Sequence, residues 1–187
     1  MKRRWYDLCG KVIFVAGAYG VGKSTFCNKV SESLNIPSFS SGDLISEKNG
    51  EKYGANKTVK NKENNQKVLI NAVKEKIAKS PKILLAGHFC IFDAHNKVEF
   101  LPEFVYKELD LSKIILLETD ANTIIGNLQK RDNKKYTVEN INELLAAESL
   151  QAHKIAIELN IPIVTHRMNF NQSDFEILKS IIEGSET

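Results

Sequence analysis

The residues with the clearest chemical pattern form the segment Gly17-Ala18-Tyr19-Gly20-Val21-Gly22-Lys23-Ser24. It follows the apolar run Val12–Ala16, which is typical of a buried strand, and it leads into a stretch with helical spacing. Glycines at such a turn let consecutive backbone N–H groups point inward around an anion, and the first amides of a helix add the positive end of its dipole. The segment is therefore predicted to bind the phosphates of a nucleotide.

The same segment supplies a cation and a hydroxyl in the pattern G-x-x-x-x-G-K-[ST], the P-loop. Lys23 is expected to reach the β- and γ-phosphates of ATP, and the Ser24 hydroxyl is expected to bind the Mg²⁺ that bridges them. A plain glycine turn with an exposed lysine is the structural alternative. The predicted ATP-binding residues are Gly17, Ala18, Tyr19, Gly20, Val21, Gly22, Lys23, Ser24 and Thr25.

The rest of the chain alternates short apolar runs with longer amphipathic stretches, which is typical of a parallel sheet covered by helices. Strands are predicted at Lys11–Ala16, Pro37–Ser40, Lys82–Ala86, Lys113–Glu118 and Ile161–Thr165. Helices are predicted at Lys23–Leu34, Val68–Lys79, Thr137–Leu159 and from Ser173 or Asp174 to Gly184, with Thr137 as a cap. Together they predict an α/β P-loop fold of three layers, with a five-stranded parallel sheet and helices on both faces.

Length and composition fit one P-loop domain over residues 1–187, expected in the cytoplasm and without a membrane span. The three cysteines, Cys9, Cys27 and Cys90, form no close pair, so we expect reduced and mostly packed thiols rather than a disulfide framework or zinc site. A net charge of +3, carried mainly by lysines, does not indicate nucleic-acid binding. The oligomeric state is left open.

Two polar stretches, Ser46–Lys67 and Gln129–Tyr136, interrupt the packing pattern and are predicted to be covers over a site. They define an acceptor-binding insertion at about residues 42–80 and a short lid at about residues 129–137.

Several segments resemble the adenylate kinase family of nucleoside-monophosphate kinases, and in particular its archaeal-type branch. Ser40-Ser41-Gly42-Asp43-Leu44 matches the acceptor segment of that family, and Ala86-Gly87-His88 stands where the branch has Asp-x-His at a strand end. Asn65-Gln66-Lys67, Phe100-Leu101-Pro102 and the lid segment Lys130-Arg131-Asp132 continue the similarity.

The resemblance implies transfer of the γ-phosphoryl group of ATP, with bound Mg²⁺, to a nucleoside monophosphate, with AMP as the first candidate acceptor. The implied catalytic residues are Lys23, Arg131 and Asp43, and the implied acceptor-binding residues are Ser40, Gly42, Asp43, Lys60 and His88. Each also has a structural alternative: Arg131 as a solvated surface residue, Asp43 as a helix cap, and His88 as a group hydrogen-bonded in its loop.

Two departures from the family leave the acceptor open. The branch has a carboxylate at the position of Ala86; Asp43 is the first substitute we expect, and Glu118 or Asp120 the second. Long-lid relatives have an acceptor-binding arginine at the position of Ser46, and only the lysines of the polar stretch offer a replacement: Lys57, Lys60, Lys62 and Lys67.

Three alternatives to a nucleoside-monophosphate kinase remain. A P-loop kinase could phosphorylate a non-nucleotide small molecule. An ATP-binding module could hydrolyse ATP slowly and act through a protein or RNA partner. A nucleic-acid binder with a structural P-loop would show affinity that falls steeply with salt.

Overall fold

The computed structural model describes residues 10–50, 62–130 and 135–184. Its main sheet contains five parallel strands in the order β2-β3-β1-β6-β7, with β1 at the centre. Their bounds are β1 Val12–Ala16, β2 Ser38–Ser40, β3 Ile83–Ala86, β6 Leu111–Glu118 and β7 Ile163–Arg167. The predicted fold class and all five predicted strands are confirmed, with ends shifted by one or two residues.

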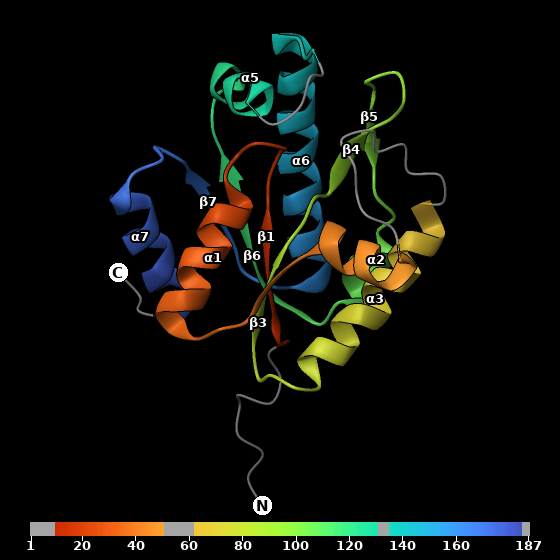
Figure 1. The fold of residues 1–187 in the computed structure, drawn as a ribbon, viewed down its shortest axis with the longest axis vertical. Coiled ribbons are helices and arrows are strands. Elements are labelled where there is room, and N and C mark those ends of the chain that lie inside the picture. The colour runs from red at the N-terminus through yellow and green to blue at the C-terminus, as the bar shows by residue number, and fades with distance from the viewer. Residues whose placement is uncertain (1–9, 51–61, 131–134, 185–187) are drawn as a thin grey trace, which may run out of the picture.

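Helices cover both faces of this sheet (Figure 1). Their bounds are α1 Lys23–Leu34, α2 Ser41–Asn49, α3 Lys62–Ile77, α4 Phe104–Glu108, α5 Ala121–Gln129, α6 Val138–Leu159 and α7 Gln172–Glu183. The predicted α1 is confirmed at both ends. α6 begins behind the predicted cap Thr137, whose side chain accepts a hydrogen bond from Asn140 N. α7 ends at Glu183 and is capped by the predicted Gly184, which has a positive φ of 79°.

Alternate residues of the central strands point to opposite faces and so build two cores. Phe14 and Ile114 lie on the face covered by α3, α4 and α6, whereas Val15 and Leu117 lie on the face covered by α1 and α7. Figure 1 shows α1 and α7 on the same side of the sheet. Burial on both faces explains why these strands read as unbroken apolar runs in the sequence.

Sequence reasoning missed several short elements. A two-stranded antiparallel hairpin, β4 Cys90–Phe92 with β5 Val98–Phe100, follows β3, and α4 and α5 were not predicted. The polar stretch Ser46–Lys67 is helical at both ends, because α2 extends to Asn49 and α3 begins at Lys62; the helix start predicted at Val68 is therefore wrong by six residues. Residues 51–61 lie outside the described part of the chain.

Among the described residues, no helix combines the length and the apolar character needed to cross a membrane. Cys27 and Cys90 are buried free thiols, as expected, and Cys9 lies outside the described residues.

Gly87, at the exit of β3, has no room for a side chain. A Cβ atom built there would lie 2.6 Å from the Phe14 ring and 2.9 Å from Ser41 Oγ, whereas one built at Gly126 in α5 would meet nothing within 4 Å. We therefore predict that Gly87→Ala lowers the free energy of unfolding by about 1–3 kcal/mol. Gly126→Ala, the control, should raise it by about 0.5–1 kcal/mol. Urea denaturation measures both changes, and an unaltered midpoint for Gly87→Ala would contradict the packing described.

Candidate active site

The phosphate loop joins the central strand β1 to α1 through three glycines with positive φ: Gly17 at 140°, Gly20 at 77° and Gly22 at 98°. Gly22 is the N-cap of α1, so the first unpaired amides of that helix open onto the loop. The Asn127 side chain of α5 donates a hydrogen bond to Gly20 O at 2.9 Å and so links this helix to the loop. The backbone thus has the turn that the sequence predicted, at the position predicted.

Lys23 lies against this loop rather than in solvent. It is only 9% exposed, and its Nζ donates hydrogen bonds to Gly17 O at 2.6 Å and Ala18 O at 2.9 Å. The same Nζ lies 3.5 Å from His88 Nδ1. The exposed-lysine alternative is therefore wrong, and the structure brings Lys23 together with His88, 65 residues away in the sequence.

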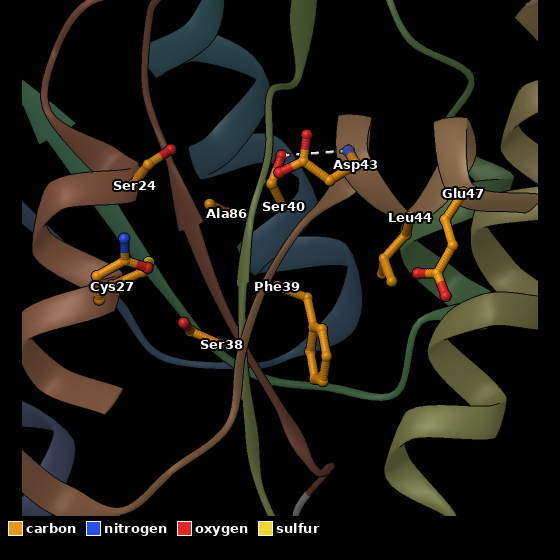
Figure 2. A pocket seen from close by; sticks show the side chains of 10 residues that line it. Ser24, Cys27, Ser38, Phe39, Ser40, Asp43, Leu44, Glu47 and Ala86 are labelled. Atoms are coloured by element: carbon orange, nitrogen blue, oxygen red, sulfur yellow. Dashed lines mark hydrogen bonds between the residues drawn. The ribbon is translucent and has the colours of Figure 1, made fainter. Parts of the chain in front are cut away.

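A narrow cavity of about 240 Å³ lies beside the loop, between α1 and the start of α2. Figure 2 shows Ser24 on one side of this cavity, Ser40 and Asp43 on the other, and the small side chain of Ala86 between them. A larger residue at position 86 would take up part of this space.

Of the three carboxylates considered as substitutes for one at position 86, Asp43 is the one that lines the cavity. Asp120 instead caps α5, accepting hydrogen bonds from Thr123 N and Thr123 Oγ1.

The start of α2 shows which residue caps this helix, and so tests the helix-cap alternative for Asp43. Ser40 is the N-cap of this helix, and its Oγ accepts a hydrogen bond from Asp43 N at 3.4 Å. The exposed Asp43 carboxylate is therefore not needed as the cap. Ser46 Oγ donates to Gly42 O, so the residue that stands where long-lid relatives have an arginine only reinforces its own helix.

A second and larger cleft, of about 1520 Å³, runs from the phosphate loop to α2, α3 and the segment after β3. Its lining includes Lys23, Ser40, Gly42, Asp43 and His88. The structure therefore brings together the described residues that the resemblance implied for catalysis or acceptor binding, whereas the further candidates Lys67, Glu118 and Asp120 do not line this cleft. Gln66, which is buried, and Ser41, which is half-buried, also line this cleft, and neither was predicted as a site residue.

Aromatic rings line the cleft beside the loop. The Tyr19 ring centroid lies 4.3 Å from that of His88 and 6.2 Å from that of Phe92, and Phe92 stacks on Tyr136 at 5.9 Å. Phe92 is half-buried in the cleft, whereas Phe89 is fully buried in the core, packed against Phe14. Of the two phenylalanines considered for base stacking, Phe92 is the one that faces the cleft.

Some predicted residues fall outside the described residues: Arg131, Lys60 and Lys57. Lys67 is described, and its Nζ forms an exposed ion pair with Glu63 at 3.0 Å.

Sequence reasoning missed Glu148 of α6, which is 1% exposed. It accepts hydrogen bonds from the backbone amides of Gly17, Phe89 and Cys90. Burial raises the pKa of this carboxyl, opposed by the charge of Lys23 and by the three amide donors. In the sequence Glu148 stands on the apolar stripe of this helix, four residues after Leu144 and four before Ala152, and that spacing is the signal that could have identified it as buried.

Comparison with known proteins identifies the family of this chain. Residues 16–145, which include the phosphate loop and most of the cleft, match the family described as AAA domain. The chain belongs to this family. It is an adenylate kinase-like P-loop kinase, and 139 of its residues are 27% identical to an adenylate kinase isoenzyme 6 homolog of Schizosaccharomyces pombe, covering 74% of this chain and 69% of that protein.

Solved structures agree with the P-loop kinase fold. Shikimate kinase from Acinetobacter baumannii in complex with shikimate gives a TM-score of 0.63 at 15% identity, covering 97% of this chain and 98% of that one. An unliganded sugar kinase from Janibacter sp. gives 0.56 at 13% identity, covering 94% and 96%. At these identities the likeness concerns the fold alone.

Cys27 lines the narrow cavity, and its thiol should be inert in the folded protein. Burial raises its pKa to about 12, even though the charge of Lys23 lowers it. Because the thiolate is the nucleophile and predominates only above the pKa, we predict that iodoacetamide at pH 8 leaves Cys27 unmodified. Peptide mass spectrometry measures the modification, with protein unfolded in guanidinium chloride as the control. Native alkylation as fast as in the unfolded chain would contradict the prediction.

Proposed function

We propose that this P-loop kinase transfers the γ-phosphoryl group of ATP to a nucleoside monophosphate, with AMP as the preferred acceptor. The proposal is supported by one observation above all: a single cleft runs from the phosphate loop to α2 and α3. Its volume of about 1520 Å³ exceeds the roughly 300–1,000 Å³ of a pocket for one small ligand. A donor and an acceptor can thus lie side by side, with the γ-phosphate between them.

In the proposed reaction an oxygen of the acceptor phosphate attacks the γ-phosphorus of ATP. The bond from that phosphorus to the β–γ bridging oxygen breaks, and the products are ADP and the nucleoside diphosphate. Such transfer depends on positioning and on neutralising charge rather than on a covalent catalyst. Lys23 supplies a positive charge at the loop, and His88 beside it lies where the acceptor phosphate would approach. Arg131 is proposed to add positive charge from the lid.

The residues around Ala86 fit a magnesium ion. A hydroxyl, Ser24, and a carboxylate, Asp43, face one small cavity, and oxygen ligands supplemented by water are what Mg²⁺ prefers. We propose that Ser24 holds the ion directly and Asp43 through water, in the role of the carboxylate that the family has at position 86. When bound with ATP, the ion neutralises charge on the β- and γ-phosphates.

A second candidate acceptor is a small alcohol. Two carboxylates, Asp43 and Glu47, line the narrow cavity, and Ser46 offers no positive charge there. Carboxylates accept hydrogen bonds from hydroxyl groups but repel a phosphate dianion. This arrangement favours a neutral polyhydroxylated acceptor if the phosphate of a nucleotide does not bind near His88.

An acceptor panel tests the proposal. ADP formation from ATP should rise at least tenfold on adding AMP, and less with GMP, CMP, UMP or a neutral polyol such as glycerol or glucose. Lys23→Ala should lower kcat by about 100-fold or more, because the charge on the transferred group loses its buried cation. Lys82→Ala, which removes an exposed lysine, is the control. Stimulation by an alcohol alone would favour the second candidate, and hydrolysis unaffected by any acceptor would favour an ATPase.

Magnesium dependence tests the proposed metal site. Ser24→Ala and Asp43→Asn should each raise the Mg²⁺ concentration for half-maximal rate by about 10-fold or more, since each removes an oxygen directed at the ion. Glu32→Gln, an exposed substitution on α1, is the control. If Asp43→Asn changed the acceptor KM and left the Mg²⁺ dependence unaltered, Asp43 would belong to the acceptor site alone.

A further inference from the structure

One buried carboxylate connects two segments of the site that are far apart in the sequence. Glu148 Oε1 accepts hydrogen bonds from Gly17 N at 3.1 Å and Phe89 N at 2.9 Å, and Oε2 accepts from Cys90 N at 2.8 Å and Phe89 N at 3.0 Å. Gly17 opens the phosphate loop, and Phe89 and Cys90 directly follow His88. Hydrogen bonds between an ionised carboxylate and amides are about twice as strong as neutral ones, so this contact holds both segments firmly.

The same contact restrains His88 from one side, and Tyr106 restrains it from the other. Tyr106 Oη donates a hydrogen bond to His88 O at 2.8 Å, and the following amide, Phe89 N, donates to Glu148. Between these two anchors the His88 ring packs against Tyr19 and lies 3.5 Å from Lys23 Nζ. The backbone of His88 is therefore fixed before any ligand binds.

Charge links the carboxylate to the phosphate loop as well. The positive charge of Lys23 lowers the pKa of Glu148, against the larger effect of burial. Breaking a buried arrangement of opposite charges by removing one partner leaves the other uncompensated. Lys23 and Glu148 are therefore expected to depend on each other.

We propose that Glu148 is a positioning residue for phosphoryl transfer. Its carboxylate fixes the Gly17 peptide relative to the His88–Cys90 segment, and so fixes the phosphate donor relative to the acceptor. It touches neither substrate and acts through these amides. A displacement of about 1 Å between reacting groups can cost about 100-fold in rate, so such a clamp has a measurable effect. The inference rests on the proposed function, because it assigns His88 to the acceptor side.

The test replaces the carboxylate with groups of matched shape or charge. Glu148→Gln keeps the shape but turns an N–H donor toward amide donors, and Glu148→Asp keeps the charge on a side chain one methylene shorter. Glu143→Gln, exposed on the same helix, is the control. The values of kcat, both KM values and the Kd for ATP are measured well below the unfolding midpoint of each variant, so that every sample is folded.

We expect Glu148→Gln to lower kcat by about 10–100-fold at saturating substrates, with a smaller change in the Kd for ATP. Glu148→Asp should recover part of that loss. A lower unfolding midpoint with kcat within twofold of wild type would overturn the inference, because the carboxylate would then be structural only. If Glu148→Gln does not fold, the same criteria are applied to Glu148→Asp.

Failure of the proposed function gives a different result. A wild-type protein that transfers phosphate to no nucleoside monophosphate contradicts that function directly. The effect of Glu148→Gln is then measured on the acceptor that does respond, or on ATP hydrolysis without an acceptor. An unchanged rate there overturns the positioning role, and a rate lowered tenfold supports it.

Discussion

The sharp turn at the end of β1 is the constraint on which the rest of the structure depends. Its strand is buried on both faces at the centre of the sheet, and the chain must then expose consecutive amides within a few residues. Positive φ values at Gly17, Gly20 and Gly22 make this possible at little steric cost. The fixed strand and the helix α1 then leave the loop little freedom, so neighbouring elements can be placed against it.

The elements with a strong pattern could be predicted from the sequence, and those without one could not. Strands such as β1 consist of apolar residues alone, and α1 begins and ends at clear signals. The three-residue strands of the β4–β5 hairpin are too short to show a period. The helix α2 is also hard to predict, because it has Gly42 in its first turn and Gly50 as its C-cap, and glycine does not favour helix. Their formation depends on packing against elements that are distant in the sequence.

Site residues can likewise be divided into those that a local sequence pattern identifies and those that depend on the tertiary structure. Lys23, Ser24 and Asp43 belong to local motifs, and a local motif carries its own spacing. The partners of Glu148 are backbone amides 58, 59 and 131 residues away, and any residue type except proline offers such an amide. The helical spacing places Glu148 on the buried face of α6, but its hydrogen-bond partners are determined by the tertiary structure alone. The small side chain at Ala86, where the resemblance implies a carboxylate, was visible in the sequence, but the cavity that adjoins it was not.

The hydrogen bonds from Lys23 to Gly17 O and Ala18 O have a consequence for ligand binding. A lysine side chain loses roughly 1.5–2 kcal/mol of rotamer freedom when it is immobilised, and here folding has already imposed that loss. An arriving phosphate must compete with two carbonyl oxygens for the ammonium, but it meets a side chain that is already ordered and largely dehydrated. We therefore expect a ligand of high charge density to draw the ammonium away from those carbonyls more readily than a weaker anion does.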